Sequence, residues 1–271
     1  MSRSYLFIPG NTPSMIQNLD VFESDAVIID FEDSVSVFDK DSARILIENF
    51  LIKFDFKNTE IFIRINDSES KFFLDDVKAT KDLNIDGYVL PKASVNSINK
   101  LNEISNKKII PIIESPMAVL RCEDIAKSKN VRGLLLGAED LTKELEINRT
   151  TLGKEILYTR SKIVLICNAY GIESIDTPFT SKDNEEELRI DVLNAKNLGF
   201  TSKSSIHPNH VDLINTIFSP SDAEIYEARR IVEKAKTNTK GAFSLDGRMI
   251  DLPVIERAQK VIDKAKKYKL M

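Results

Sequence analysis

Two acidic residues in the middle of the chain follow short apolar segments in a similar way. Glu114 comes directly after residues 109–113, and Asp140 lies just beyond the apolar run 133–137. Runs of this length and composition are typical of strands buried on both faces, and a helical pattern at 115–129 separates them. Because ligands bind at the C-terminal ends of parallel strands, we predict that both carboxylates face one pocket. There they would be oxygen ligands for a hard divalent cation.

An acidic residue after a strand often has a simpler role, as a helix cap or a solvated loop residue. For Glu114 this alternative is weakened by the next two residues, Ser115 and Pro116. Ser is a good N-cap, and Pro is favoured at the first helical position. The capping position is therefore already filled, and Glu114 needs another explanation.

Further polar residues gather where the active site of such a fold would lie: Asp30, Glu32, Asp33, Arg64, Lys92, Asp176 and His207. Arg64 stands inside an apolar run, so its charge must meet an anion. That anion is either a structural carboxylate such as Glu32 or the carboxylate of a substrate, held in a bidentate fork. Glu32 and Asp33 would orient Arg64 or bind metal-bound water.

Four of these residues have alternatives that the sequence leaves open. Lys92 either meets a phosphate or is simply solvated. His207 is predicted to be a hydrogen-bonded structural residue rather than a base. Asp176, like Asp30, could equally be satisfied by backbone groups at the rim of the fold.

Strand-like segments recur along the chain with helical patterns between them. The predicted strands are 5–9, 26–30, 60–65, 87–91, 109–114, 133–137, 174–179 and 204–208. Eight strand–helix repeats indicate an α/β fold of the (β/α)8 TIM-barrel type, which we place at residues 1–218. Residues 219–271 are then predicted to be a C-terminal helical and hairpin segment, which either covers the barrel or acts as a lid.

Composition excludes several classes of protein. The chain has 271 residues and a net charge of −4, with a pI of about 5.5, no Trp and no basic patch, so no nucleic-acid partner is expected. With only two His, a zinc site is not expected. No apolar run reaches membrane-spanning length, and the first strand begins too early for a signal peptide. We therefore expect a cytoplasmic protein with buried, reduced Cys122 and Cys167.

Two carboxylates and one Arg, without a catalytic Cys or His, favour a metal-assisted reaction on an anionic, oxygen-rich small molecule. Mg2+ is usually held by one or two carboxylates, waters and substrate oxygens. It would polarise a hydroxyl or carbonyl oxygen. Reasoning from the residues alone ends at a Mg2+-dependent barrel enzyme that acts on a carboxylate.

The chain also resembles a known family, in segments that span nearly its whole length and keep the family's order. These segments are 6–11 (LFIPGN), 29–35 (IDFEDSV), 64–66 (RIN), 90–92 (LPK), 113–115 (IES), 137–141 (GAEDL), 206–208 (IHP) and 244–251 (SLDGRMID). They are similar to the HpcH/HpaI aldolase/citrate lyase family, and within it to citrate lyase beta subunits and their stand-alone relatives. One departure is the segment 201–203 (TSK), where relatives usually carry Gly before the Lys.

The resemblance implies a (β/α)8 barrel with a C-terminal lid, usually in trimers, and Mg2+ held by Glu114 and Asp140. It implies cleavage of a 3-hydroxyacyl thioester of coenzyme A or of an acyl carrier protein to an acetyl thioester and a 2-oxo acid. Arg64 would bind the carboxylate of the acid, and Asp251 would reach the site of a neighbouring subunit and transfer the enolate proton. Three further residues are assigned with them, namely Asp33 to catalysis and Lys92 and Ala138, beside Glu114, to substrate binding.

Three alternatives stay open at this point. One is the citryl-carrier lyase subunit of a citrate lyase complex, in which the acyl group rides on a carrier protein. Another is a pyruvate-type aldolase of the same fold, although such relatives place a His near Asp33, which this chain lacks. The third is a non-catalytic binding or scaffold protein, against which the joint presence of Arg64, Glu114, Asp140 and Asp251 argues.

Overall fold

The protein divides into two compact units, Met1–Asn215 and Thr216–Met271, in a computed structural model. The structure describes residues 2–54, 56, 58–238 and 242–271. The division falls within a single helix, α10 (Val211–Phe218). Each unit is described by itself.

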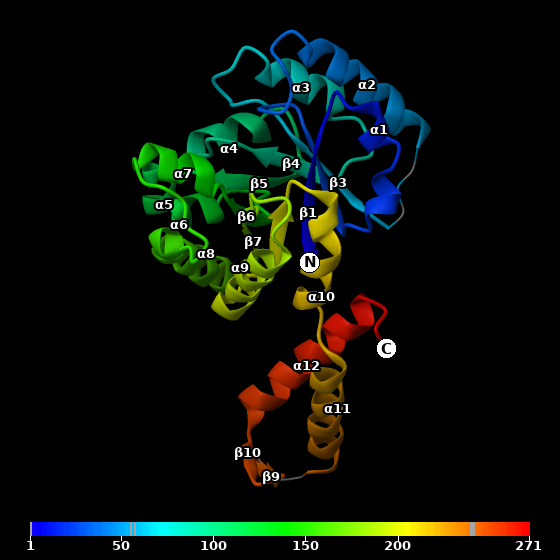
Figure 1. The fold of residues 1–271 in the computed structure, drawn as a ribbon, viewed down its shortest axis with the longest axis vertical. Coiled ribbons are helices and arrows are strands. Elements are labelled where there is room, and N and C mark those ends of the chain that lie inside the picture. The colour runs from blue at the N-terminus through cyan, green and yellow to red at the C-terminus, as the bar shows by residue number, and fades with distance from the viewer. Residues whose placement is uncertain (1, 55, 57, 239–241) are drawn as a thin grey trace. The chain divides into compact units, whose positions relative to one another are not determined.

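The first unit is a closed barrel of parallel strands in the order β1 to β8, with β8 pairing back onto β1 (Figure 1). The strands are β1 (Ser4–Pro9), β2 (Ala26–Asp30), β3 (Glu60–Arg64), β4 (Gly87–Leu90), β5 (Lys108–Ile113), β6 (Gly133–Leu136), β7 (Glu173–Asp176) and β8 (Ser202–Ser205). This confirms the predicted (β/α)8 architecture.

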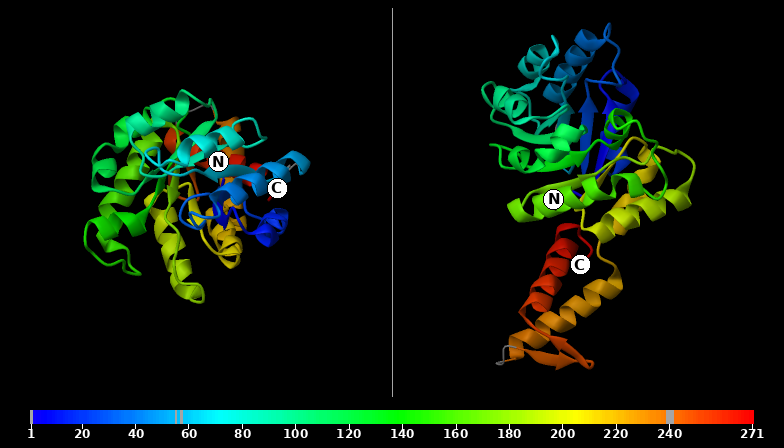
Figure 2. Two further views of the ribbon diagram at one scale, coloured as in Figure 1. Left: turned by 90° about the horizontal axis from the view of Figure 1, so that it is seen from above. Right: turned by 90° about the vertical axis from the view of Figure 1, so that its left-hand side faces the viewer.

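Helices cover the outside of the strands (Figure 2). They are α1 (Pro13–Ile16), α2 (Lys40–Lys53), α3 (Phe73–Thr80), α4 (Val95–Asn102), α5 (Pro116–Leu120), α6 (Cys122–Ala126), α7 (Ala138–Glu144), α8 (Leu157–Tyr170), α9 (Glu185–Leu198) and α10. The single helix expected at 115–129 is in fact the pair α5 and α6, because Arg121 leaves helical geometry (φ −93, ψ 12). Ser115 caps α5 as predicted, by accepting a hydrogen bond from the Ala118 N–H.

The centre of the barrel is apolar over most of its height. Its packed side chains are Tyr5, Ala26, Ile28, Phe62, Val89, Ile110, Ile112, Leu135 and Ile175. Strands that are buried on both faces show a continuous apolar run rather than an alternating pattern. That property explains why most of the strands could be located from sequence.

The last strand breaks this rule, and its prediction was two residues late. β8 is Ser202–Ser205, four polar residues that are all fully buried. The predicted strand at 204–208 followed the apolar Ile206, which is instead exposed. Burial of β8 is possible because its side chains find partners, for example the Ser204 hydroxyl on the Asp176 carbonyl at 2.7 Å.

The second unit contains α11 (Asp222–Thr237), a hairpin of β9 (Phe243–Leu245) and β10 (Arg248–Ile250), and α12 (Leu252–Lys267). The two helices pack against each other around a small apolar core formed by Ala228, Ile231, Ile250, Ala258 and Ile262. Among the described residues, none of the helices is long and apolar enough to cross a membrane.

Candidate active site

A cavity of about 410 Å³ lies at the C-terminal ends of the barrel strands. Its lining includes six residues singled out from sequence: Asp30, Asp33, Arg64, Glu114, Ala138 and Asp140. Asp30 and Arg64 lie in β2 and β3, and the other four lie in the loops that follow β2 and β5 and in α7, which follows β6. The structure therefore brings Glu114 and Asp140 into one pocket, together with Arg64.

Arg64 is held from behind by Asp30. The two residues are register partners in β2 and β3, so their side chains start opposite each other at the barrel rim. Arg64 Nε donates to Asp30 Oδ1 at 2.6 Å, and Nη2 donates to Oδ2 at 2.7 Å. Burial alone would raise the pKa of Asp30, but Arg64 lowers it below its ordinary value. A fork of this kind fixes the plane of the guanidinium.

The remaining edge of Arg64 faces the cavity. Its Nη1 lies 3.2 Å from both Asp33 Oδ2 and Glu32 Oε2, while the guanidinium sits over the Phe7 ring at 5.2 Å. The Asp33 side chain is 70% exposed, so water competes with this contact. Both roles considered for Arg64 are therefore compatible with the structure. A structural carboxylate binds one edge of the guanidinium, and a substrate carboxylate could replace the exposed Asp33 at the other edge.

Glu114 is a buried carboxylate whose position is fixed by its neighbours. Oε1 accepts a hydrogen bond from the Lys92 backbone N–H at 2.5 Å. A Cβ at Gly137 would lie 2.7 Å from the Glu114 Cβ and 2.9 Å from Oε2, so only Gly leaves room here. The pKa of Glu114 is raised to about 7, mainly by burial and also by the charge of Asp140, while the hydrogen bond from the Lys92 N–H opposes the shift.

The charges of the cavity are unbalanced. Its lining carries five acidic side chains, of which Asp30 and Asp33 pair with Arg64 and Glu139 pairs with Arg149. In the described part of the chain, Glu114 and Asp140 form no ion pair. Burial also raises the pKa of Glu32 to about 8, with Asp33 and Glu114 adding to the shift. Two unpaired carboxylates beside this excess of negative charge suit a divalent cation.

The same two carboxylates are too few to enclose a metal ion completely. No group of three or more His, Cys, Asp or Glu residues in the described ranges forms a metal site. Water and substrate oxygens would have to complete the coordination, as is usual for Mg2+. The donor set therefore fits Mg2+ better than Zn2+, which is normally held by three or four protein ligands.

Three residues considered from sequence lie apart from this cavity. The Lys92 side chain is 65% exposed and pairs with Asp67 at 3.5 Å, although its backbone contacts Glu114. Asp176 is buried among other charged groups. His207 packs edge-on against His210, at 5.2 Å between ring centroids, which suits the structural role predicted for it.

Asp251 belongs to the second unit, where it is the N-cap of α12. Its Oδ1 accepts a hydrogen bond from the Val254 N–H at 3.3 Å. Asp is among the preferred residues at this capping position, and Pro253 is favoured in the first turn that follows it. The hydrogen bond leaves open a further role for the carboxylate.

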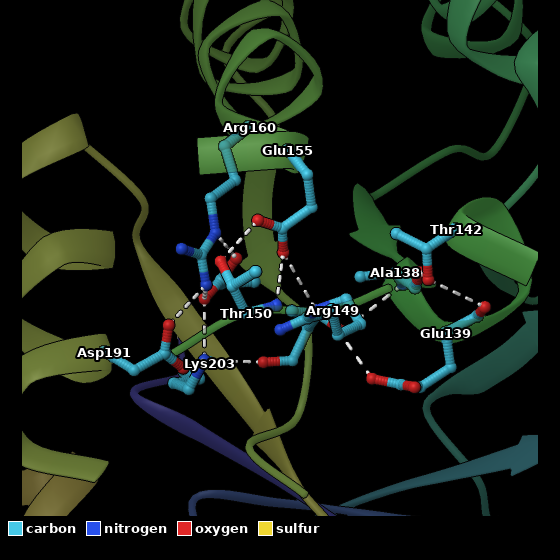
Figure 3. Close-up of polar contacts among 11 residues, drawn as sticks. Ala138, Glu139, Thr142, Arg149, Thr150, Glu155, Arg160, Asp191 and Lys203 are labelled. Carbon is cyan, nitrogen blue, oxygen red and sulfur yellow. Dashed lines mark hydrogen bonds and ion pairs between the residues drawn. The ribbon is translucent and has the colours of Figure 1, made fainter. Parts of the chain in front are cut away.

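A buried ionic cluster that includes Arg160, Asp191 and Lys203 was not identified from the sequence (Figure 3). Arg160 forms a fork on Asp176, at 2.9 Å for both bonds, and also donates to Asp191 at 2.7 Å. Lys203 Nζ lies 2.7 Å from both carboxylates and 2.6 Å from the Thr177 carbonyl oxygen. Thr177 lines the cavity, so the cluster supports its wall.

The one signal of this cluster in the sequence was a lysine inside a polar strand, at residues 202–205. Thr177 itself carried no signal, because its role depends on a partner far along the chain. Its hydroxyl accepts a hydrogen bond from the Ala138 N–H at 3.3 Å. This contact anchors the first turn of α7, which carries Asp140.

Comparison with known proteins identifies the family. The model of the HpcH/HpaI aldolase/citrate lyase family matches residues 3–208, which is most of the chain and the whole barrel up to β8. The chain belongs to this family. The family resemblance seen in the sequence motifs is thereby confirmed.

Individual members match over almost their full length. The citrate lyase subunit beta of Haemophilus influenzae is 33% identical over 98% of this chain and 97% of its own length. The L-malyl-CoA/beta-methylmalyl-CoA lyase of Rhodobacter capsulatus is 30% identical over 100% of this chain and 96% of its own. A crystal structure of CitE from Mycobacterium tuberculosis with magnesium, acetoacetate and coenzyme A has a TM-score of 0.84 and 26% identity, and covers 97% of each chain.

Proposed function

We propose that this protein is a Mg2+-dependent carbon–carbon lyase. It cleaves a 3-hydroxy-3-carboxyacyl thioester, such as citramalyl-CoA, malyl-CoA or a citryl thioester, to an acetyl thioester and a 2-oxo acid. The observation that carries this proposal is the cavity in which Arg64 faces the two unpaired carboxylates, Glu114 and Asp140. Family members named as lyases of such thioesters, and a family structure with magnesium and coenzyme A, support it.

Glu114 and Asp140 are the proposed Mg2+ ligands. When bound, Mg2+ supplies a Lewis acid that favours negative charge on the hydroxyl oxygen of the substrate. Arg64 binds the substrate carboxylate through the Nη groups that point into the cavity, and the exposed Asp33 gives way. Ala138 lines the cavity and is assigned to substrate contacts. Lys92, whose side chain pairs with Asp67 outside the cavity lining, is assigned to a substrate contact on the family resemblance alone.

The proposed cleavage uses two proton carriers, Asp33 and Asp251. Asp33 accepts the proton of the 3-hydroxyl group as the oxygen becomes the ketone of the 2-oxo acid. The electron pair of the broken C–C bond passes to the acetyl thioester, which leaves as an enolate. Asp251 then gives a proton to the enolate carbon. Arg64 stabilises the negative charge of the departing 2-oxo acid throughout.

Residues 219–271 are proposed to form the lid, and the active assembly is proposed to be a homotrimer. Both follow from the family resemblance, which implies that Asp251 reaches the site of a neighbouring subunit. Exposed apolar side chains on α5 and α8 also favour association of subunits: Leu120 at 65%, Tyr158 at 67% and Leu165 at 71% exposure. A cytoplasmic location fits the two buried free cysteines.

A substrate panel tests this function. Citramalyl-, malyl- and citryl-CoA are incubated with the protein and Mg2+, and acetyl-CoA release is measured. Release from one of them supports the proposal and names the acid. Cleavage of a citryl group only on an acyl carrier protein would identify a citrate lyase subunit instead. No release from any thioester, with no Mg2+ binding, would indicate a scaffold protein.

Arg64→Lys is expected to reduce kcat/KM for the best substrate strongly. Lysine keeps the positive charge but loses the planar fork that binds Asp30 and a carboxylate together. The loss of a bidentate, charge-assisted contact should weaken transition-state binding by about 2 kcal/mol or more. Steady-state kinetics with the substrate panel measures this loss. Near-normal kcat/KM for every acid in the panel would show that Arg64 has only a structural role.

Mixing of inactive subunits tests whether Asp251 acts across subunits. We expect Asp251→Asn and Asp140→Asn proteins to be inactive alone and partly active when co-assembled. Some mixed sites then hold an intact Asp140 from one subunit and an intact Asp251 from its neighbour. Native mass spectrometry must first confirm that mixed assemblies form. If they form and remain inactive, Asp251 acts within its own subunit or only caps α12.

A further inference from the structure

Arg149 lies near Glu139, a residue that lines the cavity (Figure 3). It lies between two carboxylates, with Nη1 3.6 Å from Glu139 Oε1 and Nε 3.6 Å from Glu155 Oε1. Both nitrogen atoms are buried, and neither has a hydrogen-bond partner among the described residues. The guanidinium is therefore held by charge at a distance longer than a hydrogen bond.

A role in stability explains this arrangement poorly. Burying a guanidinium costs desolvation energy, and two contacts at 3.6 Å return little of it. Glu155 does not depend on Arg149, since it already accepts hydrogen bonds from the Thr150 N–H at 3.0 Å and from the Thr150 hydroxyl at 2.6 Å. For Glu139, by contrast, Arg149 provides the positive charge with which it pairs.

Glu139 is the immediate neighbour of Asp140, and both are exposed and line the cavity. Without Arg149, the first turn of α7 would present two free carboxylates to the cavity that Glu114 also lines. Three carboxylates and few waters suit Ca2+, which takes six to eight oxygen ligands in flexible geometry. Mg2+ demands a strict octahedron and keeps several waters, so a third carboxylate is a disadvantage for it.

We infer that Arg149 is a positioning residue that engages Glu139 and thereby restricts the metal-binding carboxylates to Glu114 and Asp140. This inference rests on the proposed metal site. It assigns to Arg149 the selection of Mg2+ over larger cations, such as Ca2+, that bind more oxygen ligands. Its effect is passed on through Glu139 and does not require Arg149 to touch either the metal or the substrate.

Metal titration of the full-length protein without substrate tests this role. Calorimetry gives the Kd of Mg2+ and of Ca2+ for the wild type, Arg149→Met, Glu139→Gln and the double variant. Arg149→Met should raise the preference for Ca2+ over Mg2+ by about fivefold, which is about 1 kcal/mol and the upper end for a partly exposed ion pair. Glu139→Gln alone should leave the preference unchanged, and the double variant should return it to the wild-type value.

The double variant separates this role from a merely structural one. If the shift caused by Arg149→Met persists in the double variant, Arg149 acts on the loop around Glu155 and the inference is wrong. An unchanged preference in Arg149→Met also overturns it. Arg189→Met is the matched control, because Arg189 forms a similar 3.5 Å pair with Glu185 on the surface of α9.

Two further outcomes are distinguishable. Should Arg149→Met fail to fold by thermal unfolding, Arg149→Lys replaces it, and a smaller shift that Glu139→Gln cancels is expected. Absence of that cancelled shift counts against Arg149. A wild type that binds neither cation would overturn the proposed metal site together with this inference, whereas normal Mg2+ binding without coupling overturns the inference alone.

Discussion

Glu114→Gln and Asp140→Asn are each expected to abolish Mg2+-dependent thioester cleavage while the barrel remains folded. Each change removes one negative charge from the two carboxylates that have no ion pair in the described part of the chain. Gln at position 114 can still accept the hydrogen bond of the Lys92 N–H, so the local structure should persist. Mg2+ titration by calorimetry and acetyl-CoA release measure the two losses.

The pH dependence of Mg2+ binding gives a second measurement of the same site. Burial raises the pKa of Glu114 to about 7 in the metal-free protein, so Mg2+ must displace a proton below that pH. Apparent affinity should fall as the pH drops from about 7. Without Mg2+, the folded state holds this proton more tightly than the unfolded chain, so stability decreases as the pH rises from the ordinary pKa of 4.5 towards 7. Glu114→Gln should remove that part of the slope.

Thermal unfolding of both variants is the control for their folding. Glu123→Gln on α6 is a matched substitution, because Glu123 is exposed and pairs with Lys127 rather than lining the cavity. It should leave Mg2+ affinity unchanged. Wild-type affinity in Glu114→Gln or Asp140→Asn would contradict the assignment of that residue as a ligand.

Lys203→Met is expected to destabilise the barrel by about 3–5 kcal/mol, because breaking a buried ion pair leaves an uncompensated charge. Lys203 is fully buried and is the ion-pair partner of Asp191 Oδ2, at 2.7 Å. Burial would raise the pKa of Asp191, but Lys203 and Arg160 hold it at about 2. In the variant, two carboxylates share one guanidinium. Urea unfolding followed by circular dichroism measures the change.

The matched control replaces an exposed lysine, Lys81→Met, which should change stability little. A double variant tests the cause. Lys203→Met with Asp191→Asn leaves Arg160 and Asp176 as a neutral pair, so part of the lost stability should return. If the double variant is no more stable than Lys203→Met, lost packing rather than unbalanced charge explains the effect.

The fold was predictable from sequence where burial and apolar composition coincide. β2 (Ala26–Asp30) has the residue limits that its pattern predicted. The predicted start of β8 was two residues late, because burial there depends on ions and hydroxyl groups whose partners lie about 27 residues away in the chain. The helix prediction failed at Arg121, because a break between two short helices leaves no periodic signal. An apolar sequence pattern indicates segments that are buried by the hydrophobic effect. It does not indicate polar residues that are buried together with hydrogen-bond or ion-pair partners.

The candidate site was predictable in its position but not in its pairing. Strand ends converge in a barrel, so Arg64, Glu114 and Asp140 had to lie near one another. That Asp30 forms a fork with Arg64, in addition to the expected contact with Glu32, follows from strand register, which a sequence alone does not state. The ion pair between Arg149 and Glu139 depends on the path of the chain after α7. No local sequence pattern predicts that path.

The fork between Asp30 and Arg64 also affects how the free energy of 2-oxo acid binding divides between enthalpy and entropy. A free arginine side chain loses up to about 2 kcal/mol of rotamer entropy when a ligand orders it. Here Asp30 has already ordered the guanidinium during folding, with bonds of 2.6 and 2.7 Å. A 2-oxo acid should therefore bind to a guanidinium that is already rigid. Its binding should involve little further loss of Arg64 side-chain entropy. Asp30→Asn would move that ordering from the folding step to the binding step.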